Sequence, residues 1–545
     1  MINIKLTEVL NNPYINKGTA FTEQEREVFS LEGRLPPAIQ TIDEQSDNFL
    51  RKLSGMGTDY DKHRYLMNLY ADNRTLFFYI VENNIKKLLP IIYTPTIAEA
   101  VKHFSKDNDQ ARDAVYISTA KPDKIKSALE NSTKNLSVIK LMVITDGEGV
   151  LGMGDWGING AAISIGKLAV YTVAAGLNPQ EVLPVVIDAG TNNEELLNDT
   201  YYLGNRQKRI SGEPYLKFID QFISIASELF PNVLFHWEDF GIRHAQLILD
   251  KYRDKLCTFN DDIQGTGIMM VSALNSVEKI TQKKLTDHTI MIFGAGTAGI
   301  GIADLILAEL KDKGMPEEEA KQRIYLYDRH GIVHSEMKGA TAGQQRYAQA
   351  KDRFERLPDT LEEAVEAVKP TILIGSSGQS GAFSKDVVEH MHKYTERPAI
   401  FPISNPASLA EAKAVDIVNW TKGKGLVVTG SPSEPVEYEG VTYVIGQANN
   451  ALLYPGLGLG LVTAQAKRVT DSVLLSAAHA VNDIQDLSEE GTALLPDVSR
   501  LREVSDRVAE AVINKVIEEN LNQVDISDSA EAVRQNSWEA VYRPL

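Results

Sequence analysis

The sequence predicts an α/β protein in which a helical N-terminal region leads into two successive α/β units and a helical C-terminal tail. Residues 41 to 88 place apolar side chains at helical spacing, whereas from residue 140 onward short β-branched runs alternate with polar loops and helices. With 545 residues, the chain is also too long for one ordinary domain. We therefore expect two large domains, each with its own core.

The first α/β unit follows the helical region. We expect Pro90 and Pro95 to break the helical pattern around IIYTPT, and strand-like runs to start with KLMVITDG at 140 to 147. VLPVVIDAGTNN (182 to 193) and NVLFHWEDF (232 to 240) repeat the same form, a short apolar strand followed by a polar loop. Such repetition is typical of a parallel sheet covered by helices.

The second α/β unit begins near residue 265. HTIMIF (288 to 293) precedes GAGTAG (294 to 299) and an amphipathic helix that ends at Gly314. A helical tail starts near residue 471, and the later strands are expected at 323 to 328, 371 to 377, 398 to 404 and 425 to 431. We expect the domains to span residues 1–264 and 265–525, followed by a tail at 526–545.

Composition narrows the class of protein. The net charge of −18 argues against a nucleic-acid partner, and no uninterrupted apolar span of membrane length is evident. Residues 1 to 18 lack the basic and apolar stretches of a secretory signal. Cys257 is the only cysteine, so no intrachain disulfide can form, and a buried structural thiol is more frequent in such a place than a reactive one. These observations favour the cytoplasm as the location of the protein.

Three glycines, Gly294, Gly296 and Gly299, form a GxGxxG signature between a strand and a helix. In that place backbone N–H groups and the helix N-terminus can bind a pyrophosphate, although a tight structural turn would use the same glycines. Asp328, at the end of the next strand, suits the adenosine ribose hydroxyls and favours NAD over NADP, whereas Arg329 beside it weakens that preference. The sequence therefore predicts a Rossmann-type NAD-binding domain.

Two short acidic loops, HWEDFG at 236 to 241 and FNDDIQGTG at 259 to 267, precede or adjoin this domain. Hard oxygen donors of this kind suit Mg²⁺ or Mn²⁺ rather than Zn²⁺, although helix caps and solvated turns are the ordinary alternative. The four carboxylates belong to Glu238, Asp239, Asp261 and Asp262. Because neighbouring strand residues face opposite sides, Glu238 and Asp239 can share one ion only at a strand end or turn. A divalent metal beside a dinucleotide indicates metal-assisted redox chemistry on a small oxygenated acid.

Further polar residues are candidates for proton transfer and substrate binding. Lys167 lies among apolar and small residues in AAISIGKLAVYT. Burial beside a cation would make it a base, but a lysine that reaches from a helix face to water is the commoner case. Tyr93 in YTPT is either a core aromatic or a proton donor. The amides of Asn405, Asn449 and Asn450 either bond to local backbone or donate to a substrate carboxylate.

The chain resembles the malic enzyme family from residue 16 to its C-terminal VYRPL, on the motifs YTPT, VITDGEGVLGMGDWG, IGKL, IDAGTNN, EDF, FNDDIQGT, GAGTAG, ISNP and QANN. The resemblance implies a substrate and metal domain ahead of the NAD-binding domain, L-malate as substrate, and a homodimer or homotetramer. It implies that Glu238, Asp239 and Asp262 bind Mn²⁺ or Mg²⁺. It also implies that Lys167 is the general base and Tyr93 the general acid. Asp261 would lie beside the metal and position Lys167. The implied cofactor contacts are Gly294, Gly296, Ala298, Gly299, Asp328, Asn405 and Asn449, and the implied substrate contacts are Asn405 and Asn450.

Gly149 departs from the family pattern. In malic enzymes this position, within DGEGVLGMGD here, carries an arginine that binds a malate carboxylate, which a glycine cannot do. Together with GDWG, HWEDFG, YLGNRQKR and QGTG, the departure resembles the malolactic branch of the family, which converts L-malate to L-lactate and CO₂ with bound NAD and a divalent metal. One alternative is an NAD-dependent enzyme that releases pyruvate, CO₂ and NADH, to which IGSSGQSGAF at 374 to 383 is more similar. A catalytically silent NAD-binding regulator is the alternative outside the enzymes.

Overall fold

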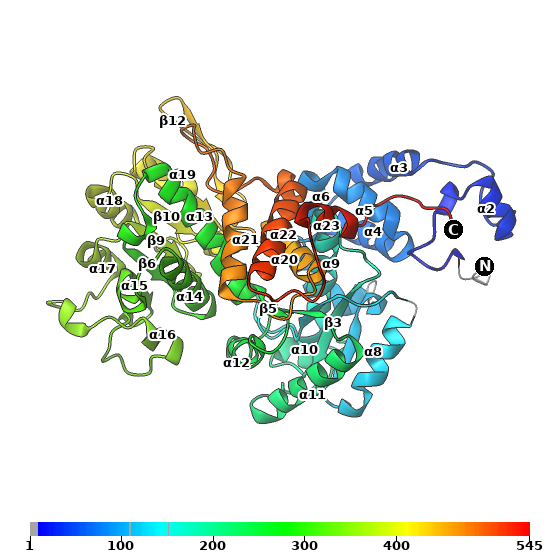
Figure 1. Ribbon diagram of the computed structural model, residues 1–545, viewed down its shortest axis with the longest axis horizontal. Helices are drawn as coiled ribbons and strands as arrows, with labels where there is room; N and C mark the ends of the chain where they lie inside the picture. Colours follow the sequence, from blue (N-terminus) through cyan, green and yellow to red (C-terminus); the bar gives the residue numbers. More distant parts are fainter. Residues whose placement is uncertain (1–8, 108–110, 135, 151) are drawn as a thin grey trace. The chain divides into compact units, whose positions relative to one another are not determined.

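The computed structural model describes residues 9–107, 111–134, 136–150 and 152–545 (Figure 1). The chain forms two compact units. The first comprises Met1–Gly241 together with Arg534–Leu545, and the second comprises Ile242–Val533. Each unit contains a parallel sheet with helices packed on it, which confirms the predicted α/β class.

The N-terminal helices of the first unit begin at well-formed caps. Thr22, Thr41 and Thr58 each accept a hydrogen bond from the N–H three residues on, and the acidic side chain at that third residue accepts one from the threonine N–H. Such capping boxes satisfy donors that a helix start leaves unpaired. The helices are α2 (Glu23–Val28), α3 (Ile42–Ser54), α4 (Asp59–Asp72), α5 (Arg74–Asn83), α6 (Ile85–Ile92) and α7 (Ile97–Asp107), so the helical prediction for residues 41 to 88 is confirmed.

The predicted helix break at Pro90 is wrong. Pro90 lies inside α6, which continues to Ile92. A proline removes one backbone donor from a helix, but here Leu88, Leu89, Ile91 and Ile92 are all buried, and their packing holds the helix in place. The chain turns at Tyr93, just before the cis peptide bond between Thr94 and Pro95.

The sheet of the first unit contains parallel strands side by side in the order β1 (Val115–Ser118), β3 (Val182–Asp188), β2 (Leu141–Thr145) and β4 (Leu234–Glu238). Every residue of β2, β3 and β4 is buried, as expected where helices cover both faces of a sheet. The further helices of this unit include α8 (Ile125–Thr133), which packs against β1 and α11, as well as α10 (Glu194–Asn198) and α11 (Glu213–Leu229). Parallel alignment places Asp146, Asp188 and Glu238 at the carboxyl edge of the sheet.

Helix α9 (Ala161–Ala175) is the central helix of the first unit. All its residues are buried, and it packs against β2 and β3 as well as α5, α6 and α7. Together with the preceding 3₁₀ turn it forms Gly157–Ala175, which by length and composition alone could cross a membrane but lies wholly inside the protein. No uninterrupted apolar span was recognised here from the sequence, because Lys167 interrupts the apolar run. Complete burial is what the core helix of a globular unit shows.

The sheet of the second unit has the order β14-β11-β10-β9-β6-β7-β8. Its strands are β6 (Ile290–Phe293), β7 (Ile324–Asp328), β8 (Gly331–Ile332), β9 (Ile372–Gly375), β10 (Ala399–Pro402), β11 (Leu426–Thr429) and β14 (Gly446–Gln447). β8 runs antiparallel to β7, whereas the other neighbours are parallel. The direction of winding reverses between β6 and β9, the place where open α/β sheets bind ligands beyond the carboxyl ends of their strands.

Helices cover both faces of this sheet. Met291, Leu373 and Ile400 belong to a core that they share with α17, α18 and α19. α14 packs on β6 and β7 and against α13, which in turn contacts α21 (Figure 1). The helices are α12 (Ile242–Tyr252), α13 (Thr266–Thr281), α14 (Thr297–Asp312), α15 (Glu317–Arg323), α16 (Ala342–Arg346), α17 (Leu361–Val368), α18 (Lys385–Tyr394), α19 (Ala414–Trp420), α20 (Tyr454–Thr463), α21 (Asp471–Asp483), α22 (Leu501–Glu518) and α23 (Ser529–Asn536). The short strands β5 (Thr258–Asn260), β12 (Val436–Tyr438) and β13 (Val441–Tyr443) complete the list. The doubly wound sheet and the helical tail thus confirm the Rossmann-type prediction.

Candidate active site

Lys167 projects from the middle of α9 and is 1% exposed. Its Nζ contacts Oε1 of Glu238 at the end of β4. The preceding Gly166 allows close packing, since a Cβ there would lie 3.2 Å from the carbonyl oxygen of Ile92. Lys167 is therefore a core residue paired with a carboxylate, and the alternative of a lysine reaching water from a helix face is excluded.

Tyr93 lies half-buried where α6 ends. Its ring packs beside Gly166, because the Cδ2 atom would be 3.4 Å from a Cβ on that glycine. The residue predicted as general acid is thus next to the helix turn that carries Lys167. In the first unit the structure brings Tyr93, Lys167 and Glu238 into one neighbourhood.

A buried chain of polar groups continues from Glu238. His236 Nε2 lies 3.0 Å from Glu238 Oε2, and His236 Nδ1 lies 2.7 Å from the Tyr171 hydroxyl. An ionised carboxylate only accepts hydrogen bonds, so in the neutral ring Nε2 carries the hydrogen and Nδ1 accepts from Tyr171. His236 and Tyr171 therefore hold one carboxylate oxygen of Glu238 and leave the other on the side of Lys167. Sequence reasoning missed both residues, although His236 lies within the acidic motif.

Asp239 has a φ of +55°, the left-handed conformation that few residues other than glycine adopt. It directly follows the last residue of β4, and one of its carboxylate oxygens lies within 4.8 Å of one from Glu238. Regular strand alternation would send the two side chains to opposite faces. The turn brings them to the same side, and two adjacent hard oxygen donors fit a Mg²⁺ or Mn²⁺ ion.

Gly149 lies against this turn. Its N–H donates to the carbonyl oxygen of Asp239 at 2.9 Å, and a Cβ at Gly149 would lie only 2.5 Å from the carbonyl oxygen of Phe240. Gly241 is equally close to the other loop, since a Cβ there would be 2.2 Å from the Glu148 carboxylate. The glycine at 149 is therefore required by close backbone packing, and an arginine does not fit this arrangement of the two loops.

Arg209 is a buried cation that sequence reasoning missed. Its Nε and Nη2 donate to the two carboxylate oxygens of Asp155 at 3.0 and 2.7 Å, and Nη2 also donates to the backbone carbonyl of Asp146 at 3.0 Å. Burial by itself raises the pKa of Asp155, but the hydrogen bonds and the charge of Arg209, together with hydrogen bonds from Asn192 and Thr191, outweigh it and lower that pKa. Arg209 thus joins the loop after β2 to the GDWG segment, and the YLGNRQKR motif was the signal that could have revealed it.

The three glycines of GAGTAG have three different surroundings. A Cβ at Gly294, where φ is +110°, would lie 2.6 Å from backbone of Ser376, and one at Gly299 would lie 1.9 Å from the carbonyl oxygen of Gly294. Gly296 has no atom within 4 Å of its Cβ position. The first and last glycines therefore allow a tight turn and close helix packing, while the middle one leaves the backbone open to a ligand at the start of α14, as a dinucleotide pyrophosphate requires. Ala298 lies half-buried in the first turn of the same helix.

Asp328 ends β7, and its carboxylate is held from two sides. The N–H of Arg329 donates to Oδ1 at 2.8 Å, and Gln344 Nε2 donates to Oδ2 at 2.7 Å. Gln344 Nε2 also donates to the carbonyl of Ala295 in the glycine-rich turn at 3.0 Å. The buried Gln344, another residue without a sequence signal, thus connects the proposed ribose acceptor to the turn that would bind the pyrophosphate.

Glu411 joins the loops at the carboxyl ends of β9 and β10. It is fully buried, and its Oε1 accepts hydrogen bonds from the Ser377 N–H at 2.8 Å, the Ser377 hydroxyl at 2.9 Å and the Ser404 hydroxyl at 2.6 Å. The Ser376 hydroxyl in turn donates to the carbonyl of Gly294 at 3.0 Å. These bonds fix the carboxyl edge of the sheet around the glycine-rich turn. No sequence signal distinguished Glu411 from an ordinary surface glutamate.

The FNDDIQG segment of the second unit forms a single π-helical turn, Asp261–Gly265, a feature frequent at functional sites. Asp261 is buried, and Asn450 Nδ2 donates to its Oδ2 at 3.0 Å. A Cβ on Gly265 would lie 2.1 Å from Oδ1 of Asp261, so the glycine makes room for that carboxylate. Asp262 lies half-buried in the same turn. The structure therefore brings Asn450 to Asp261 as a direct partner, a pairing not foreseen from the sequence.

The other predicted polar residues of the second unit have local partners. Asn449 accepts a hydrogen bond from the N–H of Ala451 at 3.0 Å and so caps a short 3₁₀ turn. This is the local backbone bonding expected of an asparagine without a ligand. Asn405 lies half-buried after β10 and accepts from the Ser431 hydroxyl at 2.5 Å. Cys257 is buried, and burial raises the pKa of its thiol to about 12, which confirms the prediction of a structural thiol rather than a reactive one.

Comparison with known protein families gives matches to most of the chain. The family model for "Malic enzyme, N-terminal domain" matches residues 70–253, and that for "Malic enzyme, NAD binding domain" matches residues 263–517. The chain is 46% identical over 541 residues to a malolactic enzyme of Lactiplantibacillus plantarum, with 99% of each chain covered. It is also 46% identical over 545 residues to NAD-dependent malic enzyme 3 of Bacillus subtilis, covering 99% of this chain and 96% of the relative.

Solved structures show the same fold at low sequence identity. A malic enzyme from Pyrococcus horikoshii superposes with a TM-score of 0.56 at 21% identity, covering 83% of this chain and 88% of that one. A malic enzyme from Entamoeba histolytica superposes with a TM-score of 0.57 at 17% identity, covering 93% of this chain and 91% of that one. These likenesses describe the fold alone.

Proposed function

The chain belongs to the malic enzyme family, and from this premise we propose that it is a malolactic enzyme, converting L-malate to L-lactate and CO₂ with bound NAD and Mn²⁺ or Mg²⁺. The observation that carries the proposal is Gly149 packed against Phe240, because this position offers no arginine to a malate carboxylate. The full-length similarity to the malolactic enzyme of Lactiplantibacillus plantarum supports it.

We assign the cofactors to the residues whose chemistry fits them. Glu238, Asp239 and Asp262 would hold the divalent cation, which would supply polarisation of the C2 oxygen of malate and stabilisation of charge on loss of CO₂. Bound NAD would supply reversible hydride transfer at C2. The cofactor contacts are Gly294, Gly296, Ala298, Gly299, Asp328, Asn405 and Asn449.

Lys167 and Tyr93 move the protons. Lys167 removes the proton of the C2 hydroxyl, and its burial keeps water away from that transfer. Tyr93 gives a proton to C3 after decarboxylation. When the hydride returns to C2, Lys167 gives its proton back to the C2 oxygen, so lactate and CO₂ form with no net oxidation. Asn405 and Asn450 orient the substrate carboxylates, and Asp261 positions Lys167.

A second function has its own support. The chain is as similar to NAD-dependent malic enzyme 3 of Bacillus subtilis as to the malolactic enzyme. An enzyme of that kind would release pyruvate and NADH after decarboxylation instead of retaining them for the second hydride transfer. A tenfold change in this partition requires only about 1.4 kcal/mol, so small differences in how the intermediates are held decide the product.

The product of one reaction distinguishes the two functions. The purified protein is incubated with L-malate, Mn²⁺ and NAD⁺ while lactate, pyruvate and absorbance at the NADH maximum are measured together. We expect lactate equal to the malate consumed and no accumulating NADH. Pyruvate and NADH formed in equal amounts would contradict the malolactic function and favour the alternative.

Two further assignments complete the proposal. We place the enzyme in the cytoplasm, where a single buried thiol such as Cys257 stays reduced. We also propose a homodimer or homotetramer. Light scattering after size-exclusion chromatography gives the mass directly, and a monomer at micromolar concentration would contradict that assembly.

A further inference from the structure

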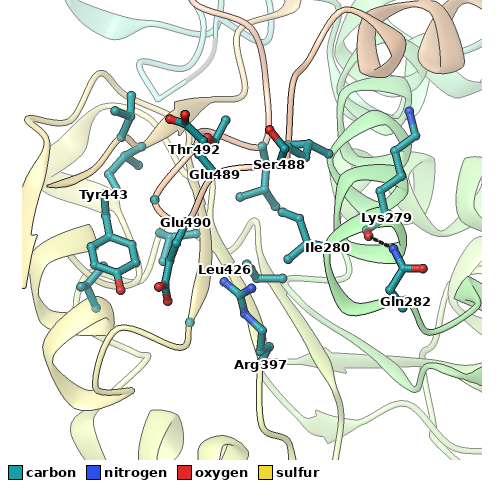
Figure 2. A pocket seen from close by; sticks show the side chains of 18 residues that line it. Lys279, Ile280, Gln282, Arg397, Leu426, Tyr443, Ser488, Glu489, Glu490 and Thr492 are labelled. Carbon is teal, nitrogen blue, oxygen red and sulfur yellow. Dashed lines mark hydrogen bonds between the residues drawn. The ribbon is translucent and has the colours of Figure 1, made fainter. Parts of the chain in front are cut away.

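A cavity of about 470 Å³ lies in the second unit at the amino ends of β10 and β11 (Figure 2). Its walls come from the end of α13, the starts of these strands, the segment that follows β13, and the loop 487–492. The glycine-rich turn follows the carboxyl end of β6 in the same sheet. Strands of four residues that rise about 3.3 Å per residue keep the two edges roughly 13 Å apart. The cavity is therefore separate from the glycine-rich turn that is proposed to bind the dinucleotide.

Arg397 is the distinctive residue of this cavity. Its Nε atom is buried and has no hydrogen-bond partner, and no carboxylate of the described residues forms an ion pair with its guanidinium. Figure 2 shows the guanidinium directed between Leu426 and Glu490. A buried donor without a partner is unfavourable, because it has lost its hydrogen bonds to water and gained none in return. The planar fork of an arginine matches a carboxylate with two parallel hydrogen bonds.

The other charges of the lining limit which anions fit. Lys279 is paired with Asp483 at 2.9 Å, so Arg397 is the cation that remains for a ligand among the described lining residues. Glu489 and Glu490 are exposed and also line the cavity, and Glu490 lies 3.6 Å from Lys424. These two carboxylates disfavour ligands with more than one negative charge. A ligand with a single negative charge can pair with Arg397 and is repelled less by the two glutamates.

Apolar groups and fixed backbone complete the cavity. Leu426 and Val427 line it but are buried, whereas Ile280 and Leu487 are partly exposed and offer a surface for a short hydrocarbon chain. Backbone hydrogen bonds hold the loop, since the N–H of Val444 donates to the carbonyl of Gly491 at 2.8 Å. Gln485 Nε2 also donates to the carbonyl of Ala493 at 2.7 Å. The walls are thus held in position rather than formed by a loose surface loop.

We propose that this cavity is a binding site for a small monocarboxylate with an apolar body, whose carboxylate pairs with Arg397 and whose chain packs on Ile280 and Leu487. The inference does not depend on the malolactic function, because the cavity contains none of the residues assigned to that reaction. Burial of the chain against apolar side chains favours longer members of the series over acetate.

Ligand-observed NMR titrations of the full-length protein test the site with hexanoate, acetate and inorganic phosphate as probes. We expect hexanoate to bind more tightly than acetate and phosphate to bind most weakly. Saturating L-malate should leave hexanoate binding unchanged. Displacement of hexanoate by malate, or phosphate binding more tightly than hexanoate, would overturn the proposal.

Variants identify the residues involved. Arg397→Gln should weaken hexanoate binding about tenfold or more through the lost charge-assisted pair, whereas Lys385→Gln, which removes an exposed positive charge elsewhere, should leave it unchanged. Glu490→Gln should strengthen binding about threefold because one repulsive charge is gone. A gain of affinity cannot come from misfolding, so this variant keeps the test valid if Arg397→Gln is unstable. Unchanged affinity in both variants would show that hexanoate binds elsewhere.

Discussion

The backbone N–H of Gly149 and the carbonyl oxygen of Asp239 are joined by a hydrogen bond of 2.9 Å. This bond ties the loop after β2 to the turn that carries a proposed metal ligand. Asp239 has a φ of +55°, a conformation that the surrounding structure must hold in place. The geometry of the metal-binding turn thus depends on a glycine ninety residues earlier in the chain.

Replacing Gly149 should therefore disturb metal binding. A Cβ in Gly149→Ala would lie 2.5 Å from the carbonyl oxygen of Phe240, so the two loops must separate. We expect a loss of about 1–3 kcal/mol in the free energy of unfolding and weaker Mn²⁺ binding, measured by titrating free Mn²⁺ with electron paramagnetic resonance. Gly57→Ala is the control, because no atom lies within 4 Å of its Cβ position. Mn²⁺ affinity equal to that of the unaltered protein would refute the dependence.

His236 should act by positioning Glu238. His236→Leu removes the donor 3.0 Å from Glu238 Oε2, and loss of such an outer partner typically lowers metal affinity or activity by about 10- to 100-fold. His236→Gln, which supplies a donor again, should recover most of the Mn²⁺ affinity, and Tyr171→Phe should cost only about threefold. The same Mn²⁺ titration, run without malate, measures all three. Equal losses of Mn²⁺ affinity in His236→Leu and His236→Gln would indicate that His236 acts through packing instead.

Glu411 should hold the carboxyl edge of the second sheet together. Glu411→Gln removes the negative charge that accepts hydrogen bonds from Ser377 and Ser404, and its N–H₂ must face the Ser404 N–H that donates to Oε2. We expect the free energy of unfolding to fall by about 2–3 kcal/mol and NADH binding, followed by fluorescence, to weaken. Glu434→Gln, at an exposed position, is the control. Unaltered Tm and NADH affinity in Glu411→Gln would contradict this role.

The pair of His479 and Glu309 should make stability depend on pH. Nε2 of His479 lies 2.9 Å from the buried Glu309, and this hydrogen bond raises the pKa of His479 above its ordinary value of 6.5. A raised pKa in the folded state stabilises the protein fully below about pH 6.5, and the stabilisation is lost as the pH rises through the raised value. Lys313, 3.4 Å from Glu309, keeps its charge over this range.

A series of thermal unfolding measurements from pH 6 to pH 8 checks the sign. Because His479 is 41% exposed, solvent screening keeps the effect small, about 1–2 °C in Tm. We expect His479→Gln to flatten the fall of Tm with pH, and the exposed His330→Gln to leave it unaltered. A steeper fall in His479→Gln would mean that the histidine is not stabilised as a cation.

The strands and the glycine-rich turn could be predicted because local patterns determine them. Short apolar runs mark β6, β7, β9, β10 and β11, and the GxGxxG spacing identifies the turn. Lys167 was identified as a candidate, but its complete burial was not predictable, because a lysine in an apolar run can also reach water. Pro90 was misjudged because tertiary packing of α6 outweighs a local helix breaker. Glu411, Gln344 and Arg209 depend on partners distant in the sequence, so their roles appear only when the chain is folded.

The complete burial of α9 has a consequence for how activity responds to heating. Lys167 is carried by the helix at the centre of the first unit, which solvent reaches only when that unit opens. Amide protons of α9 should be among the slowest to exchange with deuterium in this unit. The proposed base cannot then be displaced by fraying of a loop, so its loss and the collapse of the surrounding core are a single event.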